Sequence, residues 1–296
     1  MATRPRSAVS ADGGTVSFFQ IGAHGGPGVI VLHGILQTWR SYRDVGEDLA
    51  ASFTVYLVDR RGRGQTAAAG ADYAMATELA DLEAVAAATG ARFVFGISSG
   101  ALIALQAALA RPGLFDRVAL WEPPAVVDRV VHDELLARVT EQIGRGDVAA
   151  ALLTNMDMTD SAPLWLYPVP RFVLRPVVAF LISLEWRDGY RPGETDPPAT
   201  LLELGPTMLY DLKLLKEMDG PVERFAPVGD AAEVLLLSGT ASVAFFRRSC
   251  DELKRVVPGA RLKTFKGLVH LGAANSAVGG SPGAVGKALR AFFRGD

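Results

Sequence analysis

The first 125 residues alternate between short runs of β-branched or aromatic residues and longer segments with the apolar spacing of a helix. The runs that predict strands are Thr15–Ile21, Gly28–Leu32, Phe53–Val58, Ala91–Ile97 and Arg117–Trp121. The segments that predict helices are Tyr42–Ala51, Met75–Thr89 and Ser99–Ala110. Near-continuous apolar strands separated by helices are typical of an α/β fold with a mostly parallel sheet and helices on both faces.

This alternation stops between residues 126 and 230, where long amphipathic segments predict helices and no buried strand is evident. The predicted helices are Val130–Ile143, Asp147–Met156, Arg171–Trp186 and Ala199–Met218. The alternation then returns, with strands at Glu233–Ser238 and Arg261–Phe265 and helices at Phe245–Val257 and Pro282–Phe293. We therefore expect an α/β core from residues 1–125 and 231–296, interrupted by a helical insertion at 126–230.

The composition is that of a globular protein, with 49% apolar and 21% charged residues. A net charge of −2 provides no field of one sign to hold nucleic acid or an anionic membrane. The one cysteine, Cys250, cannot form an internal disulfide, and with four histidines it makes no zinc-ligand cluster. No signal peptide or membrane span is visible, so a cytoplasmic protein is the default expectation; the oligomeric state is not readable.

The motif Gly-x-Ser-x-Gly occurs twice, and its context distinguishes a nucleophile from a loop. In Gly96–Gly100 the motif follows the apolar run Phe93–Phe95 and opens an apolar helix. Glycine on either side relieves crowding at such a strand–turn–helix elbow. We expect Ser98 to be a nucleophile, with the Ser99 N–H at the helix N-terminus placed to bind an oxyanion. The alternative is a tight glycine turn with a buried hydroxyl.

The second copy of the motif, Gly279–Gly283, has no strand before it. Its Pro282 has no N–H to donate to an oxyanion. We expect this copy to be a loop that precedes the last helix, with Ser281 as the N-cap.

At these residues the chain resembles the α/β-hydrolase fold family. The resemblance rests on the elbow at Ser98, on His33-Gly34 and Asp59–Gly64 after two strands, and on the late His270. It covers nearly the whole chain and is loosest in the insertion. It implies that the Ile35 N–H is the second oxyanion donor and that the insertion is a cap over the active site. It also implies that Asp59–Gly64 forms a structural turn without a catalytic role.

A serine hydroxyl needs a base to become a good nucleophile, and His270 is the candidate. It follows the last strand, at the sheet edge where such folds meet ligands, and it comes after the nucleophile as in the family. The alternative is a histidine that caps the core. His24 lies among glycines, His132 on a predicted helix surface and His33 in the oxyanion-side loop, so we do not expect them to be the base.

The orienting acid departs from the pattern that the resemblance implies. The family usually carries an aspartate after the penultimate strand, where this sequence has Ser242. Glu122 instead follows the strand Arg117–Trp121, a place where some members, including haloalkane dehalogenases, carry their acid. We expect Glu122 to orient His270. The alternatives are a salt bridge or hinge role for Glu122, or another acid such as Asp251.

These residues predict a serine hydrolase that forms an acyl-enzyme on Ser98 and needs neither a metal nor an organic cofactor. The expected partner is a small-molecule substrate: a small or medium hydrophobic ester, lactone or thioester. The apolar and aromatic candidates for its pocket are Trp165, Leu166, Tyr167, Phe172, Phe180, Trp186, Tyr190, Met208 and Tyr210.

Two other hypotheses stay open. An enzyme of the same fold could use the same residues for C–C hydrolysis, for lyase or cyclisation reactions, or for cofactor-free peroxidation. A non-catalytic ligand-binding member is the second hypothesis. The missing aspartate after the penultimate strand favours it slightly, while the intact Ser98 and His270 oppose it.

Overall fold

The computed structural model describes residues 4–22, 25, 28–125, 133–158, 169–184 and 198–296. Its strands form an eight-stranded sheet in the order β1-β2-β4-β3-β5-β6-β7-β8. They are β1 (Arg4–Val9), β2 (Thr15–Ile21), β3 (Gly28–Leu32), β4 (Thr54–Val58), β5 (Phe93–Ile97), β6 (Arg117–Trp121), β7 (Glu233–Gly239) and β8 (Arg261–Phe265). The pairs β1–β2 and β2–β4 are antiparallel and the others parallel, which confirms the predicted mostly parallel sheet.

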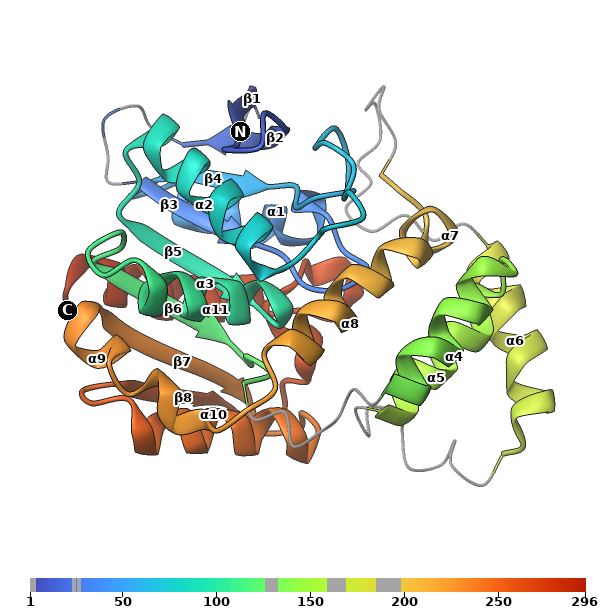
Figure 1. The fold of residues 1–296 in the computed structure, drawn as a ribbon. Coiled ribbons are helices and arrows are strands. Elements are labelled where there is room, and N and C mark those ends of the chain that lie inside the picture. The colour runs from blue at the N-terminus through green and yellow to red at the C-terminus, as the bar shows by residue number, and fades with distance from the viewer. Residues whose placement is uncertain (1–3, 23–24, 26–27, 126–132, 159–168, 185–197) are drawn as a thin grey trace.

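Helices cover both faces of the sheet (Figure 1). Those that precede β6 or follow β7 are α1 (Arg43–Leu49), α2 (Met75–Thr89), α3 (Ser99–Ala110), α10 (Ala244–Val256) and α11 (Pro282–Arg294). Between β6 and β7 the chain forms α4 (Asp133–Gly144), α5 (Val148–Met158), α6 (Arg171–Ser183), α7 (Leu201–Leu204), α8 (Met208–Glu217) and α9 (Val228–Ala231). In Figure 1, α4, α5 and α6 stand beside the sheet, and α8 runs between them and the core. No helix within the described ranges is long and apolar enough to cross a membrane.

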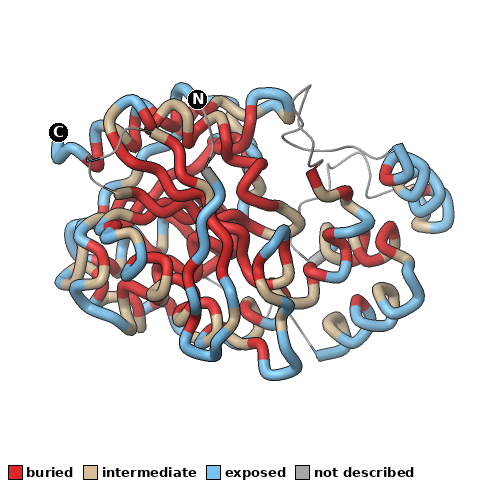
Figure 2. The backbone as a smooth tube through the Cα atoms, turned by 90° about the horizontal axis from the view of Figure 1, so that it is seen from above, coloured by how far each residue is buried: buried red, intermediate tan, exposed pale blue. Residues whose placement is uncertain are grey.

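Two hydrophobic cores lie on opposite faces of the sheet because side chains alternate along each strand. In β3, Ile30 and Leu32 pack with α2 and α3, while Val29 and Val31 pack with α1 and α11. Figure 2 shows the buried residues concentrated in the sheet layer, whereas the helices that stand apart from it are largely exposed. Burial of both faces leaves the carboxyl ends of the strands as the place for chemistry.

The sheet has its topological switch point at β3. From β3 the chain moves to β4 on one side and later crosses to β5 on the other. The loops after β3 and β5 therefore open into the same crevice, where open α/β sheets bind ligands. Because β5, β6, β7 and β8 are parallel neighbours, the segments that follow them emerge at this edge too. Ser98, Glu122 and His270 belong to these segments.

Some elements differ from the predicted ones. The pattern does not predict β1, because this edge strand has few apolar residues and is fixed by its pairing with β2. The single helix predicted over Ala199–Met218 is wrong: Pro206 lacks an amide hydrogen, and a 3₁₀ turn at Gly205–Thr207 separates α7 from α8. Ser281 occupies the N-cap position of α11, but its side chain makes no capping hydrogen bond.

We expect Gly100→Ala to destabilise the fold by at least about 2 kcal/mol, the usual cost of overpacking against atoms that cannot move. A Cβ on Gly100 would lie 2.4 Å from the Leu32 carbonyl oxygen and 2.6 Å from that of His33. The matched control is Gly283→Ala in the second motif, where nothing lies within 4 Å. This control should be neutral or up to about 1 kcal/mol more stable than wild type, since alanine favours a helix. Equal unfolding free energies for the two variants in urea titrations would contradict the expectation.

Candidate active site

Ser98 lies in a sharp turn between β5 and α3, with φ 54° and ψ −122°. A left-handed backbone is strained in a serine and needs close support. The Ser98 N–H donates to the Trp121 carbonyl at 2.9 Å, and the Ser98 carbonyl accepts the first hydrogen bonds of α3. A Cβ on Gly96 or Gly100 would lie within 2.5 Å of a backbone atom. The strand, turn and helix predicted around Ser98 are therefore present, and both glycines are needed for steric reasons.

The segment after β3, residues 33–36, is called the β3 loop below and lies against Ser98. A Cβ on Gly34 would lie 3.0 Å from the Ser98 Cβ, so the loop backbone packs directly on the serine. Ile35 is half-buried, and Leu36 has a left-handed φ of 56°. The Ser99 and Ile35 N–H groups thus belong to two segments that meet at Ser98, as an oxyanion hole requires. Their role as oxyanion donors stays a prediction.

Glu122 and His270 meet at the same edge of the sheet. Glu122 follows β6 and has no solvent exposure, and His270 begins a 3₁₀ turn after β8. His270 Nδ1 and Glu122 Oε2 are 2.6 Å apart. Glu122 Oε1 accepts from the Ser238 hydroxyl at 2.9 Å and from the Gly239 N–H at 2.8 Å. A carboxylate held on both oxygens fixes the imidazole through Nδ1 and leaves Nε2 available for another partner.

The charge of Glu122 is stabilised despite its burial. Burial alone would raise the pKa of this carboxyl, because the charged form loses its hydration. The hydrogen bond from His270 and its charge, with the Gly239 N–H, outweigh this effect and hold the Glu122 pKa below its usual value. Glu122 is therefore ionised near neutral pH.

Two aromatic residues that the sequence analysis does not single out hold His270 in place. Phe246 of α10 stacks on the imidazole, with ring centroids 3.9 Å apart and planes 6° apart. Trp121 is fully buried, and its Nε1 donates to the His270 carbonyl at 2.8 Å. Because the Trp121 carbonyl also accepts the Ser98 N–H, this one residue joins the backbones of the serine and the histidine.

The hydrogen bonds among the described residues include none between the Ser98 hydroxyl and the His270 ring, which bonds to Glu122. Catalytic hydrogen bonds are often long in the absence of substrate and tighten when it binds. Proton transfer from Ser98 to His270 therefore stays a prediction, which rests on the convergence of their segments.

Ser242, at the family's usual acid position, and the alternative carboxylate Asp251 are placed differently from Glu122. Ser242 is buried near Glu122, but its hydroxyl meets hydrogen-bond geometry with none of the described residues. Asp251 is exposed on α10. Because β6 and β7 are parallel neighbours, a carboxylate after β6 reaches the imidazole that one after β7 would reach. Glu122 is the candidate that contacts His270.

His33 is unsuited to be the base because both of its ring nitrogens are occupied. The backbone N–H of Arg60 donates to His33 Nε2 at 3.1 Å. The ring proton of His33 therefore sits on Nδ1 and is donated to the Gly34 carbonyl at 2.9 Å. Burial and the charge of Arg60 lower the pKa of His33 well below its usual value. His24 and His132 lie outside the described residues. In the part of the chain that is described, no group of histidine, cysteine, aspartate or glutamate could hold a metal ion.

Backbone strain marks the same place independently. The described residues contain three non-glycine residues with positive φ: Leu36, Ser98 and Glu122. They follow β3, β5 and β6 and are far apart in the sequence. Such strain costs about 1–3 kcal/mol per residue and clusters at functional sites. All three lie at the sheet edge that carries the candidate site.

The structure places only some of the predicted pocket residues. Those outside the described residues are Trp165, Leu166, Tyr167, Trp186 and Tyr190. Phe172 and Phe180 of α6 are 80% and 62% exposed. Met208 is fully buried, and Tyr210 packs on Tyr73 with ring centroids 5.0 Å apart. Met208 thus packs in the interior and Tyr210 is half-buried, and contacts of the pocket residues with substrate stay predictions.

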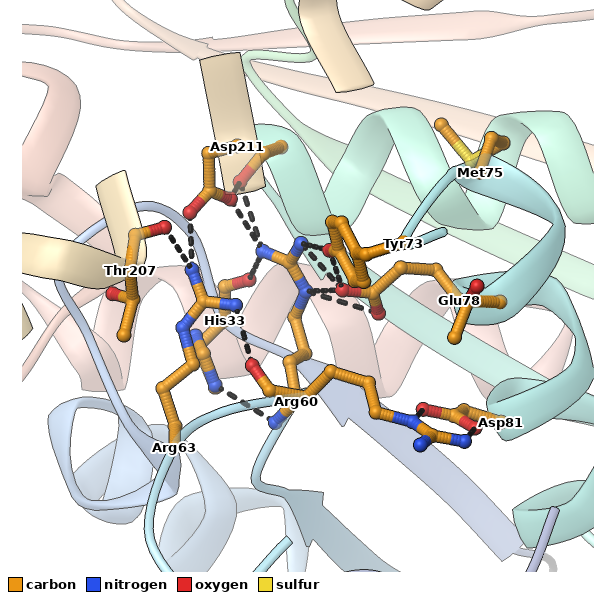
Figure 3. Close-up of polar contacts among 12 residues, drawn as sticks. His33, Arg60, Arg63, Tyr73, Met75, Glu78, Asp81, Thr207 and Asp211 are labelled. Atoms are coloured by element: carbon orange, nitrogen blue, oxygen red, sulfur yellow. Dashed lines mark hydrogen bonds and ion pairs between the residues drawn. The ribbon is translucent and has the colours of Figure 1, made fainter. Parts of the chain in front are cut away.

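A buried cluster of charged residues that the sequence pattern does not predict lies beside the β3 loop (Figure 3). The stretch Asp59–Gly64 is expected to be a structural turn, yet its Arg60 and Arg63 are fully buried and pair with Glu78 and Asp211. The run of arginines in this turn is a signal that the sequence does contain. Arginines that are buried at a sheet edge need carboxylate partners from other segments.

Comparisons with known proteins agree with this architecture. A family model described as alpha/beta hydrolase fold matches residues 27–150. An alpha/beta hydrolase from Sphaerobacter thermophilus DSM 20745 is 30% identical over 97% of this chain and 100% of that chain, with a TM-score of 0.74. A hydrolase from Pseudomonas aeruginosa PA01 is 20% identical over 99% of each chain, with a TM-score of 0.69. The enol-lactonase from Burkholderia xenovorans LB400 is 18% identical over 98% of this chain and 100% of that chain, with a TM-score of 0.67. A comparison with curated proteins gives no match.

The lowered pKa of Glu122 predicts a pH-dependent contribution to stability. A depressed carboxyl pKa stabilises the fold above the unfolded-state pKa of about 4.3, and this contribution is lost as the pH falls toward the folded-state pKa. We therefore expect Glu122→Gln to be less stable than wild type at pH 7, with a difference that narrows below about pH 4.3. Urea unfolding of both proteins from pH 7 to 3 measures this difference. A constant difference over the whole range would contradict the prediction.

Proposed function

Because the chain belongs to the α/β-hydrolase family, we propose that it is a serine hydrolase for a small or medium hydrophobic ester, lactone or thioester. Ser98 is the nucleophile, His270 the base and Glu122 the orienting acid. The observation that carries the proposal is the 2.6 Å contact between Glu122 and His270 at the sheet edge that also bears Ser98. A protein that only binds its ligand does not need an ionised carboxylate buried against an imidazole, since burying that charge costs free energy.

The first half of the proposed reaction forms the acyl-enzyme. His270 Nε2 takes the Ser98 hydroxyl proton while Ser98 Oγ attacks the acyl carbonyl. The Ser99 and Ile35 N–H groups bind the oxyanion, and the charge of Glu122 stabilises the imidazolium. His270 then gives its proton to the departing alcohol or thiol, and the acyl group stays on Ser98.

The second half releases the acid. His270 takes a proton from a water molecule, which attacks the acyl carbonyl and forms a second oxyanion at the same donors. The collapse of this intermediate returns the proton to Ser98 Oγ. When the substrate is a lactone, both parts belong to one molecule and the product is a single hydroxy acid.

The proposed substrate class is supported by one comparison and by the composition of the inserted stretch. The Burkholderia protein with this fold is an enol-lactonase, and a lactone is a cyclic ester. We assign the stretch 126–230 as a cap that covers the site. Its apolar and aromatic residues favour a hydrophobic group on the substrate.

We expect a fluorophosphonate probe to label the wild-type protein at Ser98, because the activated hydroxyl attacks phosphorus as it attacks a carbonyl carbon. Ser98→Ala should abolish both labelling and ester turnover. Ser281→Ala, in the second Gly-x-Ser-x-Gly, is the matched control and should retain both. Peptide mass spectrometry locates the adduct. An unlabelled wild type, or an adduct at Ser281, would overturn the proposal.

We expect Glu122→Gln to lower kcat for an ester by roughly 10²–10⁴-fold, because a neutral amide neither stabilises the imidazolium nor enforces its tautomer. Asp251→Asn, at the exposed alternative acid, should keep the wild-type kcat. Steady-state kinetics near pH 7 on esters of varied acyl length give both values. Wild-type turnover in Glu122→Gln would remove this residue from the mechanism and leave it a structural role.

A further inference from the structure

Asp211 of α8 carries a carboxylate with no solvent exposure beside the residue that follows the nucleophile. Its Oδ1 accepts from the Ser99 hydroxyl at 2.6 Å and from Arg60 Nη1 at 2.8 Å. Its Oδ2 accepts from the guanidinium of Arg63. Figure 3 shows the carboxylate directed at both guanidinium groups. A residue from the inserted helices thus holds the side chain of an expected oxyanion donor.

Arg60 extends this contact to the β3 loop. Its Nη1 also donates to the Ser99 hydroxyl at 3.0 Å and to the His33 carbonyl at 3.3 Å. Its Nε and Nη2 donate to Glu78 of α2 at 3.2 and 2.9 Å. The guanidinium that Asp211 holds therefore contacts both segments that meet at Ser98.

The apolar face of α8 supports the same loop. Met208 and Leu212 are fully buried in a hydrophobic cluster against which Ile35 and Leu36 pack. Met208, Leu212 and Asp211 lie on one side of α8, since residues three and four apart are neighbours on a helix. The left-handed backbone of Leu36 persists only where its surroundings enforce it, and α8 supplies part of those surroundings.

The buried cluster contains two arginines and two carboxylates, so its charges compensate one another. Arg60 and Arg63 face Glu78 and Asp211, so loss of one partner leaves an uncompensated buried charge. Burial would raise the pKa of Asp211, but the charges of Arg63 and Arg60 and the Ser99 hydroxyl lower it to about 2. The carboxylate is therefore ionised throughout the neutral range.

We propose that Asp211 is a positioning residue for the oxyanion hole, through which α8 sets the relative placement of the Ser99 and Ile35 N–H groups. The inference rests on the proposed function, because it concerns the donors named there. Without the Asp211 charge, the Ser99 hydroxyl loses an anionic acceptor and Arg60 loses one of the two carboxylates that hold its guanidinium against the His33 carbonyl. Pre-organised donors act on the transition state far more than on the bound substrate.

The central experiment is Asp211→Asn, assayed with a carboxylic ester and with its thionoester. We expect kcat for the ester to fall by about 10–100-fold with little change in KM, less than the 10²–10³-fold loss from removing a donor outright. The developing sulfur anion of a thionoester is a larger and weaker hydrogen-bond acceptor, so its turnover should fall much less. The ratio of kcat for the ester to kcat for the thionoester is therefore the quantity to measure, because a merely structural role for Asp211 would leave this ratio unchanged.

The matched control is Asp81→Asn. Asp81 is also a buried aspartate paired with an arginine, Arg61, at 2.7 Å, and its partner is the next residue of the same turn. Its loss should lower the thermal stability of the protein as the loss of a buried pair does, but leave kcat and the ester-to-thionoester ratio at wild-type values. An equal fall of the ratio in both variants would overturn the proposal.

A second variant, Ser99→Ala, decides the matter if Asp211→Asn fails to fold, as circular dichroism would show. It removes the hydroxyl and keeps the backbone N–H, and it should lower the ester-to-thionoester ratio by about 2- to 10-fold, the worth of one hydrogen bond. A folded variant with the wild-type ratio overturns the inference. Wild-type protein without turnover of either substrate counts against the proposed function instead, so the two failures are distinguishable.

Discussion

A buried carboxylate must be neutralised where it lies because water cannot reach it, and this constraint acts at two places around Ser98. Glu122 and Asp211 are both fully buried. Glu122 is balanced by groups from the ends of β7 and β8, His270 among them, and Asp211 by groups from the turn after β4 and from the start of α3. Each carboxylate thereby fixes the position of a segment distant in sequence. Glu122 fixes the segment that carries the His270 imidazole, and Asp211 fixes the segment that carries Ser99. The geometry of the candidate site follows from charge pairing across the fold.

The strained backbone at the site is held by hydrogen bonds and close packing. The Ser98 N–H is bonded to β6, and the Glu122 N–H to the Leu237 carbonyl of β7, so the sheet continues its pairing into the strained residues. Trp121 lies between these two bonds and also binds the His270 backbone. Because the rigid sheet carries these contacts, the strain costs free energy but does not loosen the site. Ser98, Glu122 and His270 are thus attached to one frame.

The sequence allowed prediction of those parts of the site that follow directly from strand ends. A glycine motif between an apolar strand and an apolar helix identifies the turn at Ser98, and the rule that neighbouring parallel strands end together brings Glu122 into reach of His270. Asp211 could not be predicted in this way, because it is 112 residues from Ser99 and lies on an ordinary amphipathic helix. The stacking of Phe246 on His270 depends on the rotation of α10 about its axis, which the apolar pattern does not fix closely enough.

The inserted helices are attached to the candidate site at both ends and in the middle. The insertion leaves the core after Ala125, shortly beyond Glu122, and returns to it before β7, whose last residues, Ser238 and Gly239, bind the Glu122 carboxylate. In its middle, Asp211 binds Ser99. A displacement of the insertion would therefore be transmitted to the carboxylate that contacts the imidazole and to the turn that carries Ser98. A substitution in the insertion that alters substrate preference would therefore also alter the alignment of the proposed catalytic groups. As a result, kcat and substrate specificity should change together.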